Sequence, residues 1–313
     1  MTAPKIAVIT GTTASGKSSL GVLLAKDLDG EIVSADSMQI YRRMDIGTAK
    51  ITKDEALGVP HHMIDVAEPR EIWSVSRYTE EADKCVQDIL SRGKLPIVVG
   101  GTGLYIDSLV AGRRFAVNSE DGSLRREICE RYDRLGGEAM LKELSECDPE
   151  RALELSPSDK KRIVRALEVF YLTGTPLSLY DQKSRSLPNK YNAAKIALTY
   201  ESRDELYSKI DSRVDKMIDQ GLFSEVQALL DSGVPENCTA MQAIGYKETV
   251  RALRGEISTG EAVDTIKRES RRYAKRQLTW LRRDKSVDWM LWNSQPDFED
   301  ARRISTKYIS ASE

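Results

Sequence analysis

The feature that most constrains this chain is a glycine-rich motif close to the N-terminus, GTTASGKS at residues 11–18. It lies between an apolar run at 6–9 and a helical pattern at 19–26, which predicts a strand, a loop and a helix. In the pattern G-x-x-x-x-G-K-S/T, the glycines let backbone N–H groups turn toward one anion, and the helix adds its positive N-terminal end. The motif therefore predicts a polyphosphate site and leaves the identity of the polyphosphate open. Its residues are Gly11, Thr12, Thr13, Ala14, Ser15, Gly16, Lys17 and Ser18.

Two side chains of this motif have separate expected roles. Lys17 is expected to reach the terminal phosphates, and the Ser18 hydroxyl to enter the coordination shell of a bound Mg²⁺ ion. The alternative is a chance match in an ordinary Gly/Ser turn, which the flanking strand and helix patterns disfavour.

Length and composition set the broad class of protein. A chain of 313 residues is long enough for a large core in one or two domains. No apolar run approaches the roughly 18 residues that cross a membrane, so we expect a cytoplasmic protein without a membrane segment. The four cysteines include no C-x-x-C pair, which disfavours a structural zinc site.

The net charge of −2 conceals a basic segment near the C-terminus. Residues 267–285 hold nine Lys/Arg against two acidic residues, so the rest of the chain is clearly acidic. On a helix, Arg268, Arg272, Arg276 and Arg283 would share one face. A concentrated basic face on an acidic body favours a polyanionic partner, whose phosphates it could follow, over a merely solvated helix.

Two further strands are predicted to end at one crevice. The run 31–36 ends in Asp36, and the run 95–99 is followed by GGTG at 100–103. Because the carboxyl ends of strands in an open α/β sheet face the ligand, Asp36 should lie across from the phosphate loop; a turn-capping role is the alternative. A nucleotide hydrolase has an aspartate after such a strand, whereas these glycines would let the backbone approach a substrate or pack tightly.

The middle of the chain interrupts this alternation of strands and helices. A strand at 61–66 and a crossover helix at 76–90 are predicted, but from about residue 112 only helical patterns follow, until a strand resumes at 195. We therefore expect an α/β fold with a P-loop-like parallel sheet flanked by helices, made of residues 1–112 and 195–313. Residues 113–194 would form a helical insertion domain.

Arg213 and a cluster of four basic residues in the insertion each need an anionic partner or contact with water. Arg213 falls on the apolar stripe of a helix predicted from 202, where it requires either a bound anion or an internal salt bridge, and the sequence does not choose between them. In the insertion, four basic residues gather at the start of a helix over 159–171. A solvated helix face and a nucleic-acid contact explain that group equally well. Its members are Lys160, Lys161, Arg162 and Arg165.

Taken together, the motifs resemble those of the bacterial tRNA dimethylallyltransferase (tRNA isopentenyltransferase) family over nearly the whole chain. One departure is Thr12, where the family usually has proline; we expect no loss of function from it. The eukaryotic members' zinc finger is absent, in agreement with the cysteine spacing. Besides the phosphate loop, the motifs are SADSMQIY at 34–41 continuing to DIGTAK at 45–50, GGTGLY at 100–105, RALE at 165–168, AIGY at 243–246 and AKRQLTW at 274–280.

The resemblance implies transfer of a dimethylallyl group from dimethylallyl diphosphate to N6 of adenosine 37, in tRNAs that read codons beginning with U. The exocyclic amine is a weak nucleophile, so a carboxylate must accept its proton, and Asp36 is our candidate. Lys17, the loop N–H groups, Mg²⁺ at Ser18 and Arg213 would stabilise the departing diphosphate. Thr13 completes the expected catalytic set.

The resemblance also implies that the partner is the tRNA anticodon stem-loop, with the target base taken out of its stack, and that the protein is a monomer. The residues expected near the tRNA are Asp36, Ser37, Met38, Gln39, Thr102, Arg125, Lys160, Lys161, Arg162, Ile163, Val164, Gln242, Gly245, Tyr246, Lys247, Lys275, Arg276 and Gln277.

Three other functions remain open at the level of sequence. An adenylate isopentenyltransferase uses the same donor on a free nucleotide, but it would need neither the insertion nor the basic helix. A P-loop small-molecule kinase would use ATP in place of the prenyl donor. A non-catalytic RNA-binding protein would not depend on Asp36.

Overall fold

The computed structural model describes residues 3–113, 115 and 122–312, and it divides the chain into two compact units. The first unit comprises Met1–Gly112 and Lys190–Glu313, and the second comprises Arg113–Asn189. In the described part of the first unit, six parallel strands form one sheet in the order β3-β2-β4-β1-β5-β6. The strands are β1 (Lys5–Gly11), β2 (Gly30–Ser34), β3 (His61–His62), β4 (Leu95–Val99), β5 (Asn192–Tyr200) and β6 (Val287–Trp292).

The apolar strand runs are buried on both faces of this sheet, as expected for a parallel sheet covered by helices. In β1, Ile6 and Val8 enter one core cluster, and the intervening Ala7 and Ile9 enter the other, because successive side chains point to opposite faces. The central position of β1 therefore brings the phosphate loop that follows it to the middle of the sheet edge.

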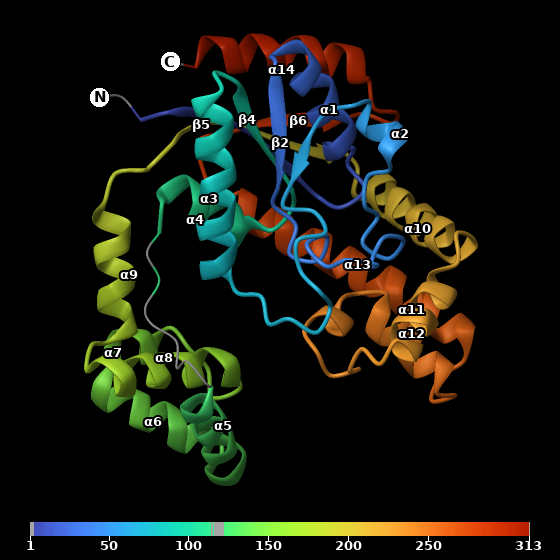
Figure 1. The fold of residues 1–313 in the computed structure, drawn as a ribbon. Coiled ribbons are helices and arrows are strands. Elements are labelled where there is room, and N and C mark those ends of the chain that lie inside the picture. The colour runs from blue at the N-terminus through green and yellow to red at the C-terminus, as the bar shows by residue number, and fades with distance from the viewer. Residues whose placement is uncertain (1–2, 114, 116–121, 313) are drawn as a thin grey trace. The chain divides into compact units, whose positions relative to one another are not determined.

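Helices cover the two faces of the sheet (Figure 1). The helices α3 (Val75–Ser91) and α4 (Gly103–Ala111) pack on one face, and α1 (Lys17–Asp27) and α14 (Phe298–Ala311) pack side by side on the other. The other helices described in this unit are α2 (Lys53–Ala56), α10 (Arg203–Asp219), α11 (Leu222–Asp231), the 3₁₀ helix Ala240–Gln242, α12 (Tyr246–Leu253) and α13 (Thr259–Leu281).

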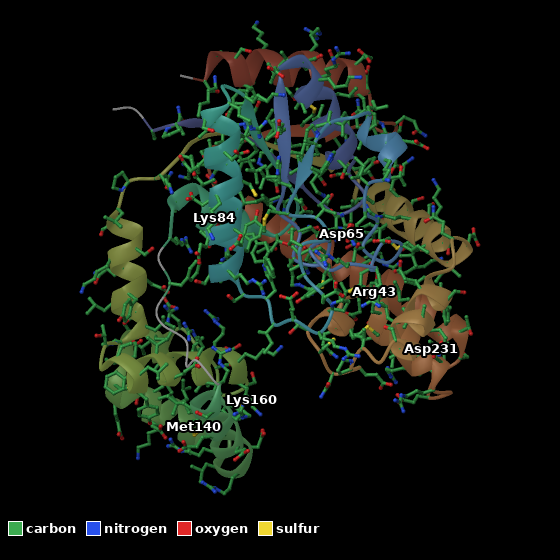
Figure 2. All side chains as sticks on the ribbon, in the orientation of Figure 1. Arg43, Asp65, Lys84, Met140, Lys160 and Asp231 are labelled. Carbon is green, nitrogen blue, oxygen red and sulfur yellow. The ribbon has the colours of Figure 1, made fainter. Side chains whose placement is uncertain are left out.

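The second unit is helical and has its own core. Ile128, Met140, Leu144, Ile163 and Leu167 are fully buried in it (Figure 2 labels Met140). Its helices are α5 (Ser123–Leu135), α6 (Gly137–Cys147), α7 (Pro149–Leu153), α8 (Lys160–Thr173) and α9 (Leu177–Ser186). A separate apolar core explains why the alternation of strands and helices stops in this part of the sequence.

Two predicted strands differ from the observed ones. The strand expected over 61–66 contains only His61–His62, because Met63 and Asp65 have positive φ values of 63° and 56° and the chain leaves the extended conformation. The strand expected from residue 195 instead begins at Asn192, whose N–H donates to the Pro4 carbonyl at 2.8 Å. The compact helical unit accordingly ends at residue 189 rather than at 194.

The α/β fold class and the sheet flanked by helices are confirmed. Across the described residues, no helix combines the length and the apolar composition needed to span a lipid bilayer.

Candidate active site

A cavity of about 820 Å³ lies in the first unit, where β1, β2 and β4 end. The phosphate loop, Asp36 and Gly100 line it beyond these strand ends, and Arg213 of α10 and Gln277 of α13 add further walls. Residues predicted from separate motifs thus meet at one place, as the rule for strand carboxyl ends in α/β sheets requires.

The phosphate loop has the backbone conformation that its glycines predict. Gly11 and Gly16 have φ values of 133° and 83°, in the region that favours glycine. A Cβ atom at Gly11 would lie 2.1 Å from the Leu198 carbonyl oxygen. That oxygen accepts the backbone N–H of Thr12 at 3.1 Å, a hydrogen bond that proline at position 12 could not donate.

The C-terminal strand and helix support the same loop. The Trp292 indole Nε1 donates to the Ser15 carbonyl at 2.9 Å, and the Phe298 ring packs against Gly16, where a Cβ atom would lie 2.7 Å from it. Phe298 also lines the cavity. Sequence reasoning missed both aromatic residues, because no local pattern connects positions 292 and 298 with residues 15 and 16.

Two cations in the cavity have no acidic partner among the described residues. Burial, then the nearby Arg213, lowers the pKa of Lys17 to about 7, and Asp36 offsets this only in part. Burial also lowers the pKa of Arg213, again against the opposing effect of Asp36. Within the described parts of the chain, no carboxylate forms an ion pair with Lys17 or Arg213, so the internal salt bridge considered for Arg213 does not occur there. Lys17 Nζ donates to the Thr12 carbonyl oxygen, and neither half-buried cation has a carboxylate partner in the described chain, an arrangement that suits an anion in the cavity.

Asp36 combines the two roles between which the sequence left a choice. Its Oδ1 accepts the backbone N–H groups of Met38 at 2.9 Å and Gln39 at 3.3 Å, which is the turn-capping geometry. The same residue lines the cavity that Lys17 and Arg213 enter. Capping by one oxygen orients the carboxylate and leaves its other oxygen out of that turn.

The glycines after β4 serve close packing between protein segments. A Cβ atom at Gly100 would lie 2.3 Å from the Ala35 carbonyl oxygen, and one at Gly101 would lie 2.2 Å from Nε2 of Gln277. The sequence interpretation that these glycines exist to admit a substrate is thus incomplete, although both residues line the cavity. The GGTG loop at residues 100–103 is held to the turn at Asp36, because the Ser37 N–H donates to Oγ1 of Thr102 at 3.1 Å.

Gln277 joins α13 to this arrangement. Its Oε1 accepts the Thr13 N–H at 2.8 Å, and its Nε2 donates to the Gly101 carbonyl at 3.1 Å. The residue is buried, so its side chain links two loops of the protein and does not form a free surface for tRNA. Gln277 also lines the cavity, and its position near the tRNA stays a prediction.

The basic face of α13 is partly neutralised by neighbouring carboxylates. Arg271 pairs with Asp211 at 2.6 Å, and Arg272 pairs with Glu269 at 2.7 Å. Lys275 and Arg276 are exposed, and the described residues provide no ion pair to either of them. From the sequence we predicted one continuous basic face. The structure shows that some of its cations are paired with carboxylates, whereas Lys275 and Arg276 are not paired with any described carboxylate.

Other residues expected near the tRNA divide by burial. The side chains of Ile163, Val164 and Tyr246 belong to hydrophobic cores, and Gly245 is also buried, so any contact of this group with tRNA would have to involve backbone atoms or neighbouring residues; its position near the tRNA stays a prediction. Exposed or half-exposed positions are Ser37, Met38, Gln39, Thr102, Arg125, Lys160, Lys161, Arg162, Gln242 and Lys247.

Two members of the exposed group in the helical unit are engaged with acidic residues. Arg125 pairs with Glu168 at 2.6 Å, and Lys160 pairs with Asp133 at 2.6 Å (Figure 2 labels Lys160). Their position near tRNA stays a prediction from the sequence.

The fold and the cavity define a class: a P-loop-like parallel α/β protein in which two cations and a carboxylate line one cavity. The model of the family described as IPP transferase matches residues 39–284. The chain belongs to this family.

Relatives agree with this assignment over nearly the full length. A tRNA dimethylallyltransferase of Caldanaerobacter subterraneus subsp. tengcongensis is 47% identical, with 98% of each chain covered. A tRNA dimethylallyltransferase of Bacillus licheniformis is 46% identical, covering 99% of this chain and 98% of the relative.

Two solved structures are similar in fold and sequence. The tRNA isopentenylpyrophosphate transferase of Bacillus halodurans is 40% identical with a TM-score of 0.72, covering 98% of this chain and 97% of that one. A eukaryotic dimethylallyltransferase described as acting on tRNA is 30% identical with a TM-score of 0.84, covering 99% of this chain and 80% of that one.

Proposed function

We propose that this chain is a tRNA dimethylallyltransferase that modifies N6 of adenosine 37 in tRNAs reading codons that begin with U. The observation that carries the proposal is the placement of two half-buried cations, Lys17 and Arg213, in one cavity with the carboxylate of Asp36. The names of the relatives support the activity. The donor dimethylallyl diphosphate, a monomeric state and a cytoplasmic location are parts of the same proposal.

The donor is proposed to bind with its diphosphate on the phosphate loop. Residues 13–18 of the loop, which lead into the N-terminal end of α1, line the cavity together with Arg213 of α10, and Lys17 is among them. As the bond between C1 of the dimethylallyl group and the diphosphate oxygen breaks, the leaving group gains negative charge. Preorganised cations in a poorly hydrated cavity lower the free energy of that state more than they would in water.

The acceptor is proposed to be an adenine base that has left its stack in the anticodon loop. Its N6 forms the new bond to C1, and the proton that N6 releases passes to Asp36. The hydrogen bonds from the Met38 and Gln39 backbone hold this carboxylate in place before the base arrives. A base fixed in this way adds roughly 10²- to 10⁴-fold to the rate.

The residues present fit a Mg²⁺ ion that is held mainly by the substrate. Ser18 lines the cavity directly after Lys17, and the described residues contain no cluster of acidic or histidine side chains able to bind a metal on its own. The Ser18 hydroxyl would supply one ligand and the diphosphate oxygens others. When bound, the ion would neutralise charge on the leaving diphosphate.

The direct test incubates the protein with Mg²⁺, labelled dimethylallyl diphosphate and unmodified tRNA, followed by digestion to nucleosides. Label in N6-(dimethylallyl)adenosine, up to one equivalent for each tRNA molecule, is the expected result. Label transferred to free AMP but not to tRNA would instead identify an adenylate isopentenyltransferase. Turnover that requires ATP would identify a kinase-like enzyme, and tRNA binding without transfer would contradict catalysis altogether.

A further inference from the structure

One wall of the cavity is a segment without regular secondary structure, residues 45–50, called the wall segment below. Asp45, Ile46, Ala49 and Lys50 line the cavity from it. Ala49 has a φ value of 47°, which is uncommon for a residue other than glycine. A segment with such a conformation and no sheet or helix hydrogen bonds needs other contacts to hold its shape.

Turn hydrogen bonds from the Ala49 and Lys50 N–H groups, and contacts of the Lys50 ammonium, are part of them, and the carboxylate of Glu225, on α11, supplies those that reach the segment from a neighbouring helix. Its Oε2 accepts the backbone N–H groups of Asp45 and Ile46, each at 2.8 Å, and its Oε1 accepts the Gly47 N–H at 3.1 Å. Oε1 also accepts the phenolic hydroxyl of Tyr246 at 2.6 Å. One carboxylate thus takes four hydrogen bonds, three of them from consecutive residues of the wall segment.

Packing reinforces this contact at Gly47. A Cβ atom there would lie 2.4 Å from the Tyr246 ring and 2.8 Å from Cδ1 of Leu222, so the backbone lies directly on α11 and α12. Near the same place, Arg43 donates to Oγ of Ser232, the residue after Asp231 at the end of α11 (Figure 2 labels Arg43 and Asp231). The helices α11 and α12 therefore fix the position of the wall segment.

The other end of the wall segment connects to Asp36. Nε2 of Gln39 donates to the carbonyl oxygens of Thr48 and Ala49, at 3.1 Å and 3.3 Å. The backbone N–H of the same Gln39 donates to Oδ1 of Asp36. A displacement of the wall segment would consequently reach the carboxylate that lies at the cavity.

We propose that Glu225 is a positioning residue for the transfer step, which holds the wall segment and, through Gln39, the orientation of Asp36. The inference rests on the proposed function of the cavity. Glu225 itself does not line the cavity, so it acts through the segment it holds and not on substrate. The hydrogen bonds of Glu225 within the described chain go to the wall segment and Tyr246, and not to the phosphate loop or the basic face of α13. Binding of the donor is therefore expected to be retained without it.

The test compares Glu225→Gln with the wild-type protein in single-turnover transfer. The amide keeps the size of the side chain but cannot accept all four hydrogen bonds, because one end becomes a donor facing donors. Transfer is expected to slow roughly 10- to 100-fold, the scale of a small misplacement of reacting groups. Affinity for dimethylallyl diphosphate should stay within about twofold, since Glu225 forms no hydrogen bond with the phosphate loop; any loss of tRNA affinity, transmitted through Gln39, should be smaller than the loss in the transfer rate.

Asp231→Asn is the matched control on the same helix. Asp231 is exposed and accepts only from Nε2 of Gln227 among the described residues, so wild-type transfer is expected. Tyr246→Phe keeps the ring against Gly47 and removes one donor of four. It should slow transfer by a smaller factor, roughly 2- to 5-fold, because the three hydrogen bonds from the wall segment to Glu225 remain.

A double-mutant cycle separates this role from plain destabilisation. If Glu225 acts through Gln39, the effects of Glu225→Gln and Gln39→Ala on the transfer rate should combine less than additively. Additive effects, or a folded Glu225→Gln protein with the wild-type rate, would overturn the inference. If Glu225→Gln does not fold, a wild-type rate in Tyr246→Phe would overturn it instead. Failure of the wild-type protein to transfer label would contradict the proposed function. That outcome is distinct from failure of the inference about Glu225, which is judged only from variants compared with an active wild-type protein.

Discussion

Two groups of cations in this protein resemble each other in the sequence and differ in the structure. In the cavity, Lys17 and Arg213 are half-buried and form no ion pair with a described residue, whereas on α13 the side chains of Arg271 and Arg272 are paired with carboxylates. Removing a cation from water without a carboxylate partner costs free energy until an anion binds, so such cations mark a candidate site. A cation on a helix surface that is already paired with a carboxylate contributes little free energy. The number of basic residues without a carboxylate partner is therefore a better indicator of anion binding than the total number of basic residues.

The largest expected effect is at the phosphate loop. Lys17→Ala removes the ammonium that faces the leaving diphosphate, so transfer should become undetectable at every tRNA concentration. Single-turnover assays with labelled donor measure this. Substantial transfer by the variant would mean that the cavity cations do not serve the donor.

The next largest effect is at the carboxylate facing those cations. Asp36→Asn keeps the size of the side chain and one acceptor for the turn, but it cannot take a proton, so transfer should fall roughly 10²- to 10⁴-fold. Donor binding and the melting temperature should change little. Near-normal single-turnover rates in the folded variant would remove Asp36 from the role of base and make Asp45 the next carboxylate to examine.

A smaller effect should appear as a pH dependence of donor affinity. The folded-state pKa of Lys17 is lowered to about 7, so above that pH the free protein must gain a proton to pair Lys17 with a diphosphate. Affinity should fall by up to about tenfold per pH unit above pH 7, because one proton is linked to binding. Calorimetric titrations between pH 7 and pH 9 measure it, and Lys17→Ala should remove the slope.

The same shift affects the stability of the free protein in the opposite direction. Between pH 7 and 10.5 the unfolded chain holds the Lys17 proton and the folded chain does not, so this group makes folding more favourable as pH rises.

The smallest effect separates available from paired cations on α13. Replacing Lys275 and Arg276 together with Gln should weaken tRNA binding and reduce its salt slope by about one for each phosphate that the protein no longer neutralises. The matched variant at Arg271 and Arg272 should change the slope less, because these side chains already have carboxylate partners. Equal changes in the two variants would show that tRNA displaces the ion pairs.

Much of the fold follows from local patterns. Short apolar runs predicted β1 and β4 within a few residues, and apolar spacing predicted α3. The short β3 could not be predicted, because its end depends on positive φ values at Met63 and Asp65 and on pairing with β2.

The residues of the candidate site likewise include some that local sequence patterns predicted and others that they did not. The phosphate loop and Asp36 were found because each lies at a strand end with a recognisable pattern, whereas Glu225, Trp292 and Phe298 have no such pattern. Their importance arises from contacts with residues distant in sequence.

By itself, the sequence determined the phosphate loop, the α/β class and the carboxylate at the end of β2, because backbone conformation and burial follow from the order of neighbouring residues. Only the tertiary structure decided which cations are paired and which predicted contact residues are core. Pairing and burial depend on side chains brought together from distant elements, as when Asp211 of α10 reaches Arg271 of α13. No short stretch of sequence contains both partners of such a contact, so only the folded chain reveals it.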